Sequence, residues 1–366
     1  MGMNTPHASP RLPLALLLAS ALCAAPGLAL PVFGQPMPAQ APSAAVAPSL
    51  SATAAPEGSA ATLTVTAVRL DLSRTIVIGA SVSDGFGSQA LVQVPNPEAS
   101  RPDAPADAPK TISKLKPVRL TEALTAVVGS DQPPRHRASA MFFMNADSIA
   151  QRQIDAAAEV SSPKPAADKA AGADQPGLVI GIDYLFWHLY GVMPEAERLK
   201  TLEKGLSRLD SLKGPVVIGD LPDMRHATLM LRPSQVPTKE TLAAANARLA
   251  EWAKAKPNVA VVPLTELVLA VMNSKPVSMG GREYTVEQAR ELMTSDGLHA
   301  TGAGLIALAQ ECMVRLKARG LLTADSTWES DPAKALARIR TSMPTVTPAP
   351  ADAPAGTIPI PSSGAK

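Results

Sequence analysis

The sequence predicts an α/β fold in which one parallel β-sheet lies between two layers of helices. Runs of about four to six apolar, mostly β-branched residues alternate with longer segments whose apolar residues recur at helical spacing. The runs lack the polar alternation of a half-exposed strand, as expected for strands covered on both faces. Helical segments between the runs supply the right-handed crossovers that parallel strands require. We therefore expect a three-layer α/β/α domain with a five-stranded parallel sheet.

Each expected element is bounded by turn or capping residues. The expected central strands are 76–79, 140–144, 178–183, 215–220 and 259–262. The expected helices are 120–128, a helix opening with a cap at Asp147 or Ser148, and then 194–212, 242–255, 286–293 and 301–319. Residues 63–72 alternate in part and predict an edge strand or lead-in, and residues 277–285 predict a short hairpin.

Proline usage limits the packed part of this 366-residue chain. Most of the 36 prolines fall in Ala-, Ser- and Pro-rich stretches that offer too little large apolar surface to offset the entropy of ordering. We expect a signal peptide over 1–30, an Ala/Pro-rich linker over 31–62, a single domain over 63–325 and a low-complexity tail over 326–366. Two excursions interrupt the domain, at 95–118 and 161–175, and the first is expected to be a mobile lid or disordered.

The N-terminal residues predict export. Arg11 precedes a mostly apolar run over 12–30, which is typical of a secretory signal peptide, and an uncleaved membrane anchor is the alternative. We expect a periplasmic or extracellular protein with no transmembrane span after signal removal. Of the two cysteines only Cys312 would then remain, so no intramolecular disulfide is expected, and its apolar neighbours on one helical face predict a core position.

The candidate catalytic residues lie in two segments far apart in the sequence. Ser81 follows the first strand in a Gly- and Ser-rich turn, at the edge where open α/β sheets bind ligands. A hydroxyl held there beside free backbone N–H groups is a candidate nucleophile, and the alternative is a turn serine that caps the next helix. Asp296 and His299 precede a helical run. The carboxylate can accept the imidazole Nδ1–H and leave Nε2 facing a nucleophile, although this spacing is also an ordinary N-cap pattern.

Together these segments resemble the first and last blocks of the GDSL/SGNH hydrolase superfamily, which read Gly-Asp-Ser-Leu-Ser-x-Gly and Asp-x-x-His-Pro. Ala80 stands for the usual Asp and Ala300 for the usual Pro. The matching segments are 79–85, 219–222, 246–259 and 296–300, so the likeness covers about residues 73–320. The resemblance implies a flavodoxin-like fold and a serine esterase or lipase-like activity.

The chemistry that these residues support is acyl transfer to Ser81. His299 would act as general base and then as general acid, and Asp296 would orient its ring. The resemblance implies three donors to the oxyanion, which in the family are the nucleophile's N–H, a Gly N–H after the second strand and an Asn side chain after the third.

This chain departs from the family at the second and third of these donors. The expected second turn reads Asn145-Ala146, and Asp183 stands at the Asn position. We expect the backbone N–H of Ala146 or a neighbour to serve at the second turn. A carboxylate at Asp183 would repel an oxyanion, so the side chain is expected to be turned away and bound by neighbouring donors, with Asn145 or a backbone N–H making the third contact. Otherwise the site is impaired.

The leading interpretation is an exported serine hydrolase acting on carboxylic esters, with acylated cell-envelope glycans or small lipid esters as candidate substrates and no cofactor. One alternative is a binding module that kept the sheet and lost hydrolysis. Another is a cofactor-binding flavodoxin-like domain, but Gly85-x-Gly87 is a weak dinucleotide match. A net charge of +2 with interspersed charges predicts no nucleic-acid partner. His136 and His226 lack the spacing of metal ligands, and His188 is expected to pack rather than to line the acyl pocket.

Overall fold

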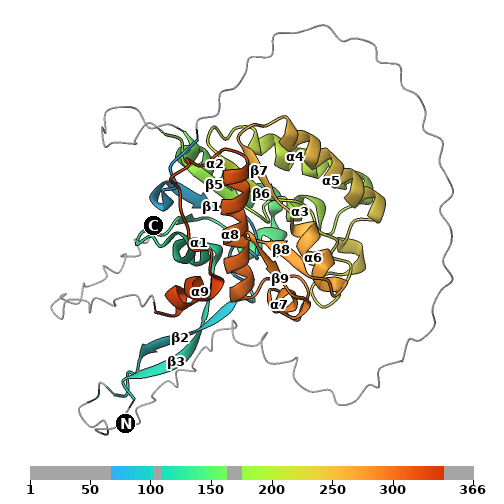
Figure 1. The fold of residues 1–366 in the computed structure, drawn as a ribbon. Helices are drawn as coiled ribbons and strands as arrows, with labels where there is room; N and C mark the ends of the chain where they lie inside the picture. The colour runs from blue at the N-terminus through green and yellow to red at the C-terminus, as the bar shows by residue number, and fades with distance from the viewer. Residues whose placement is uncertain (1–66, 100, 102–104, 106–108, 163–174, 342–366) are drawn as a thin grey trace, which may run out of the picture. The chain divides into compact units, whose positions relative to one another are not determined.

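The computed structural model describes residues 67–99, 101, 105, 109–162 and 175–341, and it contains a five-stranded parallel sheet (Figure 1). The strands lie in the order β4-β1-β5-β6-β7, and every neighbouring pair is parallel. Their bounds are Thr75–Val77 for β1, Arg135–His136 for β4, Leu178–Gly181 for β5, Val216–Gly219 for β6 and Val259–Val262 for β7. In chain order the sheet reads 2-1-3-4-5, the flavodoxin-like arrangement. The predicted fold class is confirmed.

Helices cover both faces of the sheet and complete the three layers (Figure 1). One apolar core contains side chains of α1, α8 and α9, and the other contains side chains of α2, α4 and α5. These helices are α1 Leu120–Val128, α2 Ala146–Ser161, α4 Glu195–Leu209, α5 Lys239–Lys254, α8 Gly302–Ala318 and α9 Pro332–Thr341. Neighbouring residues of the first strand alternate between the cores, since Val77 belongs to the first and Ile76 and Ile78 to the second. Both faces are therefore dry, which explains the apolar runs without polar alternation.

The remaining elements lie mostly around the carboxyl edge of the sheet. They are α3 Phe186–Leu189, α6 Leu264–Met272, α7 Val286–Glu291, the hairpin of β8 Val277–Met279 and β9 Arg282–Tyr284, and the 3₁₀ turns Leu72–Arg74 and Pro233–Gln235. The hairpin was expected. Helix α6 was not, because its apolar sequence follows β7 with only Pro263 between them. In the described part of 63–72, Val68 forms only an isolated bridge with Leu322, so the edge-strand prediction is wrong there.

The second strand of the sheet is not the predicted segment. Ala140–Met144 is a 3₁₀ helix, and the strand that pairs with β1 is β4, which ends at His136. Of the five side chains only Phe142 is buried, while Met141, Phe143 and Met144 expose half or more of their surface. The continuous apolar run at these five positions indicated a buried strand. Three of its side chains instead form an apolar patch on the surface. The following helix is capped by Asn145 rather than by Asp147 or Ser148.

The Pro-rich excursion is partly ordered. Thr111–Pro117 forms strand β3 and pairs antiparallel with β2, Gln89–Pro95 (Figure 1). The prediction of disorder over 95–118 is therefore wrong for β3, whose mostly exposed side chains gave little amphipathic signal. The alternative of a mobile lid stays a prediction. Ala90 and Val92 of β2 are buried in the first core.

Helix α9 extends the packed chain past residue 325, where a low-complexity tail was expected. Ala335 and Ile339 of this helix are buried in the first core, and Arg338 Nη1 donates to the Ala126 carbonyl oxygen at 2.7 Å. The predicted signal peptide, the linker, most of the second excursion and the end of the tail lie outside the described residues.

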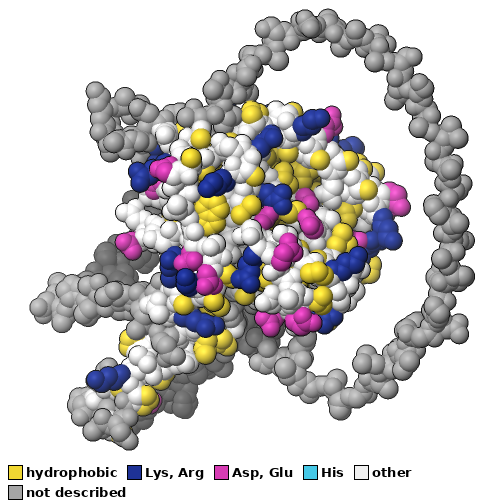
Figure 2. Space-filling view, viewed as in Figure 1, with side chains coloured by type: hydrophobic (Ala, Val, Ile, Leu, Met, Phe, Trp, Pro, Cys, Tyr) yellow, Lys and Arg dark blue, Asp and Glu magenta, His cyan; other side chains and the backbone are white. Residues whose placement is uncertain are grey.

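Charged side chains are mixed by sign on the face of the molecule shown in Figure 2. Lys and Arg alternate there with Asp and Glu, which fits the small net charge of +2. Every helix in the described part of the chain is too short or too polar to cross a membrane.

Candidate active site

Ser81, His299 and Asp296 lie together at the carboxyl edge of the sheet. Ser81 follows β1, and the other two residues come from the turn before α8. His299 Nε2 lies 3.0 Å from Ser81 Oγ, and His299 Nδ1 lies 2.7 Å from Asp296 Oδ2. The carboxylate accepts the Nδ1–H, so Nε2 is left to accept the Ser81 hydroxyl proton. The structure thus brings the three sequence-predicted residues into the order that a nucleophile, a base and an orienting acid require.

Asp296 is held as a carboxylate by donors on its second oxygen. Its Oδ1 accepts the Thr294 hydroxyl at 2.6 Å and the backbone N–H groups of Leu298 and His299 at 2.8 and 3.0 Å. Burial acts to raise the pKa of Asp296, but the hydrogen bonds outweigh it and lower that pKa to about 2. The group facing His299 Nδ1 therefore carries a full negative charge at neutral pH.

Asp183 holds the turn that carries Ser81. Its Oδ1 accepts the Ala80 N–H at 3.0 Å and the Ser83 hydroxyl, and its Oδ2 accepts the N–H groups of Val82 and Ser83 at 2.8 and 3.2 Å. Burial raises the pKa of this carboxyl, and the four hydrogen bonds partly offset that effect. Gly79 (φ 128°) makes room for it, since a Cβ there would lie 2.2 Å from Asp183 Oδ1. Asp183 is thus turned toward the backbone of this turn and is no oxyanion donor.

This arrangement leaves the Ser81 N–H free. The N–H groups before and after it point to Asp183, while no acceptor among the described residues takes the N–H of Ser81 itself. The N–H groups of Ala80 and Val82 are already bonded to Asp183, and the N–H of Ser81 between them can bind a ligand. The N–H that the sequence predicted as an oxyanion donor is therefore available.

Asn145 and Ala146 are not brought to Ser81. Asn145 is exposed at the start of α2, where its Oδ1 accepts the Ser148 N–H at 3.1 Å, and neither residue lines the cavities that open on Ser81. The predicted second turn comes too late in the chain, because the strand ends at residue 136 and not at 144. From the segment Ala140–Met144, Ala140 and Phe143 line a cavity that opens on Ser81.

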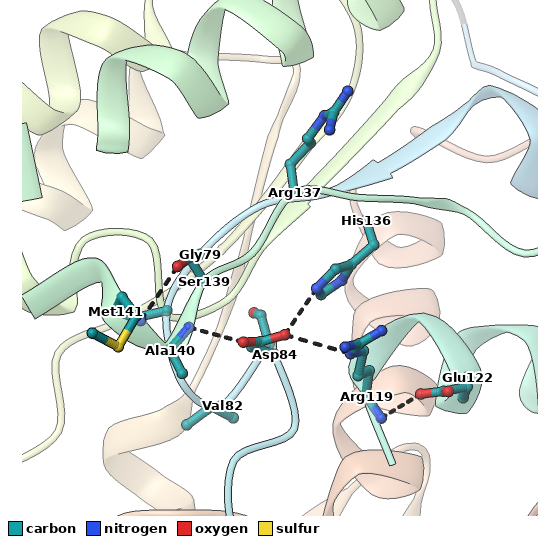
Figure 3. A network of polar contacts seen from close by, with 12 residues as sticks. Gly79, Val82, Asp84, Arg119, Glu122, His136, Arg137, Ser139, Ala140 and Met141 are labelled. Carbon is teal, nitrogen blue, oxygen red and sulfur yellow. Dashed lines mark hydrogen bonds and ion pairs between the residues drawn. The ribbon is translucent and has the colours of Figure 1, made fainter. Parts of the chain in front are cut away.

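Asp84 ties the nucleophile turn to the neighbouring elements (Figure 3). Its Oδ2 accepts the Ala140 N–H at 2.9 Å, and its Oδ1 contacts His136 Nε2 at 2.9 Å and Arg119 Nε at 3.5 Å. Burial acts to raise the pKa of Asp84, but these contacts outweigh it and lower the pKa. No local sequence pattern indicates this network, since its members come from a turn, from β4, from the Ala140–Met144 segment and from the residue before α1.

Gln153 is a second residue that sequence reasoning missed. From α2 its side chain binds the residue at the end of the first strand on both sides: Oε1 accepts the Gly79 N–H at 2.9 Å, and Nε2 donates to the Gly79 carbonyl at 2.8 Å. Nε2 also donates to the Arg137 carbonyl at 2.9 Å. A single glutamine inside a helical segment matches no sequence motif, so the role of Gln153 is evident only from its contacts in the folded protein.

The other histidines have structural contacts. His226 Nε2 donates to the Gly297 carbonyl at 2.9 Å and so braces the turn that carries the candidate acid and base. His188 is buried, its Nδ1 donates to the Tyr184 carbonyl at 3.1 Å, and its ring packs against Phe142. This is the packing position that the sequence favoured.

No group of three or more metal-ligating side chains occurs among the residues that the structure describes. Gly85 belongs to a tight turn instead of a phosphate loop, since a Cβ there would lie 2.0 Å from the Val118 carbonyl oxygen.

Two cavities open on either side of the Ser81 hydroxyl. Both are lined by Ser81, Leu298 and His299. The first has a volume of ≈ 60 Å³ and the second ≈ 190 Å³. The first cavity is lined by residues that follow β5 and β6 and by side chains of α6. The second is lined by Ala140 and Phe143 of the Ala140–Met144 segment and by Trp187 of α3.

Comparisons with known proteins are weak. No model of a known protein family matches the chain, and no curated protein sequence matches it. A solved structure from Streptococcus pneumonia, whose description names platelet activating factor, aligns at 14% identity with a TM-score of 0.33, over 71% of this chain and 86% of that one. The Bacillus subtilis protein YxiM aligns at 16% identity with a TM-score of 0.34, over 70% of this chain and 58% of that one. Such likenesses carry no argument, so the function is argued from the residues.

Proposed function

We propose that this protein is an exported serine hydrolase that cleaves carboxylic esters. The observation that carries the proposal is the pair of contacts that links Ser81 Oγ to His299 Nε2 at 3.0 Å and His299 Nδ1 to Asp296 at 2.7 Å. A hydroxyl is a weak nucleophile unless a positioned base removes its proton, and these contacts supply such a base. The carboxyl edge of an open parallel sheet is also where ligands bind in such folds.

The reaction proceeds in two halves. Ser81 Oγ attacks the ester carbonyl carbon while His299 Nε2 accepts the hydroxyl proton. The tetrahedral intermediate collapses, the bond to the alcohol oxygen breaks, and His299 returns the proton to that oxygen. Water then attacks the acyl-serine in the same way, which releases the acid and restores the Ser81 hydroxyl. Asp296 keeps the Nδ1–H oriented and stabilises the imidazolium that forms in each half.

The oxyanion of the intermediate is bound by the free N–H of Ser81. A donor at this position contributes about 3–4 kcal/mol to the barrier reduction, because it points at the oxygen that gains charge. The same geometry argues against a binding module that lost hydrolysis. The departure at Asp183, which the sequence alone left ambiguous, serves to present the Ser81 N–H instead of opposing the oxyanion.

We further propose that the substrates are esters of the cell envelope, either acylated glycans or small lipid esters.

The proposal of export rests on the sequence of residues 1–30. N-terminal sequencing of protein recovered from the envelope tests it: a start after about residue 23 is expected for a cleaved signal, and an intact Met1 in the cytosol would contradict it.

The decisive experiment is labelling with a fluorophosphonate that reacts with activated serines, followed by mapping of the modified peptide. Ser81 should be labelled, and Ser81→Ala should abolish labelling and lower kcat on a short-chain p-nitrophenyl ester by at least about 10³-fold. Ser207→Ala, an exposed serine on α4, is the matched control and should change neither. Ester turnover by Ser81→Ala equal to that of the wild type would contradict Ser81 as the nucleophile. Unlabelled Ser81 together with no ester turnover by the wild-type protein would leave the binding-module function as the remaining interpretation.

A further inference from the structure

The two cavities beside Ser81 differ in the burial of their walls. The first is walled by core side chains, of which Leu221, Leu267 and Val268 expose 1%, 5% and 5% of their surface. The second is walled by side chains that face solvent, since Phe86 and Phe143 are half exposed. The first cavity therefore reaches into the apolar core, whereas the second lies between partly exposed side chains.

We propose that the first cavity is an acyl pocket that accepts acyl groups of about two to four carbons, and that the alcohol leaves through the second. This inference rests on the proposed esterase function. The acyl group stays bonded to Ser81 through half of the reaction, and its apolar chain is accommodated best by the cavity that reaches the apolar core. The alcohol must depart to solvent after His299 protonates it, which the cavity between partly exposed side chains allows.

The size of the pocket sets the limit on chain length. An engineered apolar cavity of roughly 150 Å³ holds a six-carbon ring. The first cavity measures ≈ 60 Å³, which by the same scale holds about two to three carbon atoms. The carbonyl carbon is bonded to Ser81 and is not counted here, so the limit is an acyl group of about four carbons. A longer acyl chain would have to displace packed side chains of α6, and interiors of this density do not yield without strain.

The charges around the pocket select neutral acyl groups. Two carboxylates line it, Asp183 and Asp220, and both are engaged by backbone donors: Asp220 Oδ1 accepts the Thr265 N–H at 2.7 Å. Apart from Ser81 and His299, the other lining residues are apolar or glycine, and none is a Lys or Arg that could bind an anionic acyl group. Acetyl, propionyl and butyryl esters fit this wall, whereas succinyl esters do not.

The test varies the acyl chain and the alcohol separately. The acyl series is p-nitrophenyl acetate, butyrate and octanoate, and the alcohol series is ethyl, butyl and octyl acetate followed by proton release. In the wild-type protein kcat/KM should fall at least about 100-fold from butyrate to octanoate and should vary less than about tenfold along the alcohol series.

Leu267→Ala deepens the pocket. The ratio of kcat/KM for butyrate to kcat/KM for octanoate should therefore fall by about tenfold, while the kcat/KM values along the alcohol series should stay the same. Leu269→Ala is the matched control, because Leu269 lies on the same helix and is exposed. Where Leu267→Ala does not fold, Val268→Ala provides the smaller enlargement. Wild-type turnover of octanoate equal to that of acetate, or a variant that shifts only the alcohol series, would overturn the inference.

Fluorophosphonate labelling separates this inference from the proposed function. If Ser81 is labelled but the acyl preference is reversed, the pocket assignment fails and the esterase function stands. If Ser81 is unlabelled and every ester in both series is left intact, the esterase function fails and the pocket assignment falls with it.

Discussion

At the scale of single residues, Asp183 decides whether the nucleophile turn is intact. It stands where the resemblance implied an oxyanion-binding amide, yet it binds Ala80, Val82 and Ser83 and leaves Ser81 with a free N–H. Asp183 therefore positions the backbone on both sides of Ser81, the residue whose N–H is the proposed oxyanion donor.

This role predicts the effect of Asp183→Asn. The amide keeps one acceptor oxygen but turns an NH₂ group toward buried N–H donors, so the free energy of unfolding should fall by about 1–3 kcal/mol. kcat should fall as well, because the turn that presents the Ser81 N–H loses its clamp. Urea denaturation and an ester assay on the same samples provide the measurement.

Asp155→Asn is the control for this substitution, since Asp155 is an exposed carboxylate on α2. It should leave both the midpoint of unfolding and kcat unchanged. Equal stability of wild type and Asp183→Asn, with a gain in kcat, would show that the site lacks an amide and that Asp183 opposes catalysis.

At the scale of elements, α9 completes the first core. Ile339 and Ala335 are buried beside α1 and β2, and Arg338 Nη1 donates to a carbonyl near the end of α1. A cation at that position also complements the helix dipole. Helix α9 comes after the predicted end of the domain. The packing of β2 and α1 therefore depends on a segment whose composition indicated a low-complexity tail.

Ile339→Ala is therefore expected to cost about 2–4 kcal/mol of stability, the usual loss for a large buried aliphatic side chain. Arg340→Ala, its exposed neighbour on the same helix, should cost less than about 0.5 kcal/mol. Guanidinium chloride unfolding distinguishes the two. Equal midpoints for the two variants would mean that α9 is not part of the cooperative unit.

At the scale of the whole molecule, buried titratable groups make stability depend on pH. Burial lowers the pKa of His188 to about 4. A histidine with a depressed folded pKa contributes stability that is complete above its unfolded pKa of about 6.5 and is lost as pH falls toward the folded value. Asp296, with a pKa of about 2, adds a second loss at lower pH, between about 4 and 2.

Between pH 7.5 and 4.5 the wild-type protein should therefore lose on the order of 3 kcal/mol through His188, the amount that a shift of about 2.5 pKa units represents. His188→Gln removes this titration, so its unfolding free energy should fall less over the same interval. Subtracting the pH-induced change of the variant from that of the wild type cancels the contributions of the other ionisable groups. Parallel pH curves for the two proteins would show that His188 is not buried neutral.

The sequence by itself determined the fold class and the candidate catalytic residues. Unbroken β-branched runs such as 178–181 and 216–219 indicate strands covered on both faces, and the helical segments between them favour a parallel sheet. Ser81, Asp296 and His299 stand in short local patterns whose turns orient them. The apolar run at Ala140–Met144 shows the limit of this reasoning, because local hydrophobicity cannot distinguish a buried strand from an apolar surface beside a site.

Only the tertiary structure decided what surrounds those residues. Asp183 and Gln153 bind the nucleophile turn through contacts that span about a hundred and about seventy positions of the chain. Helix α9 packs into the core although its segment was expected to be a low-complexity tail. No local propensity encodes such contacts, since they arise where different elements pack. The same holds for the two cavities beside Ser81, whose volumes depend on how α6, the turns and the sheet edge fit together.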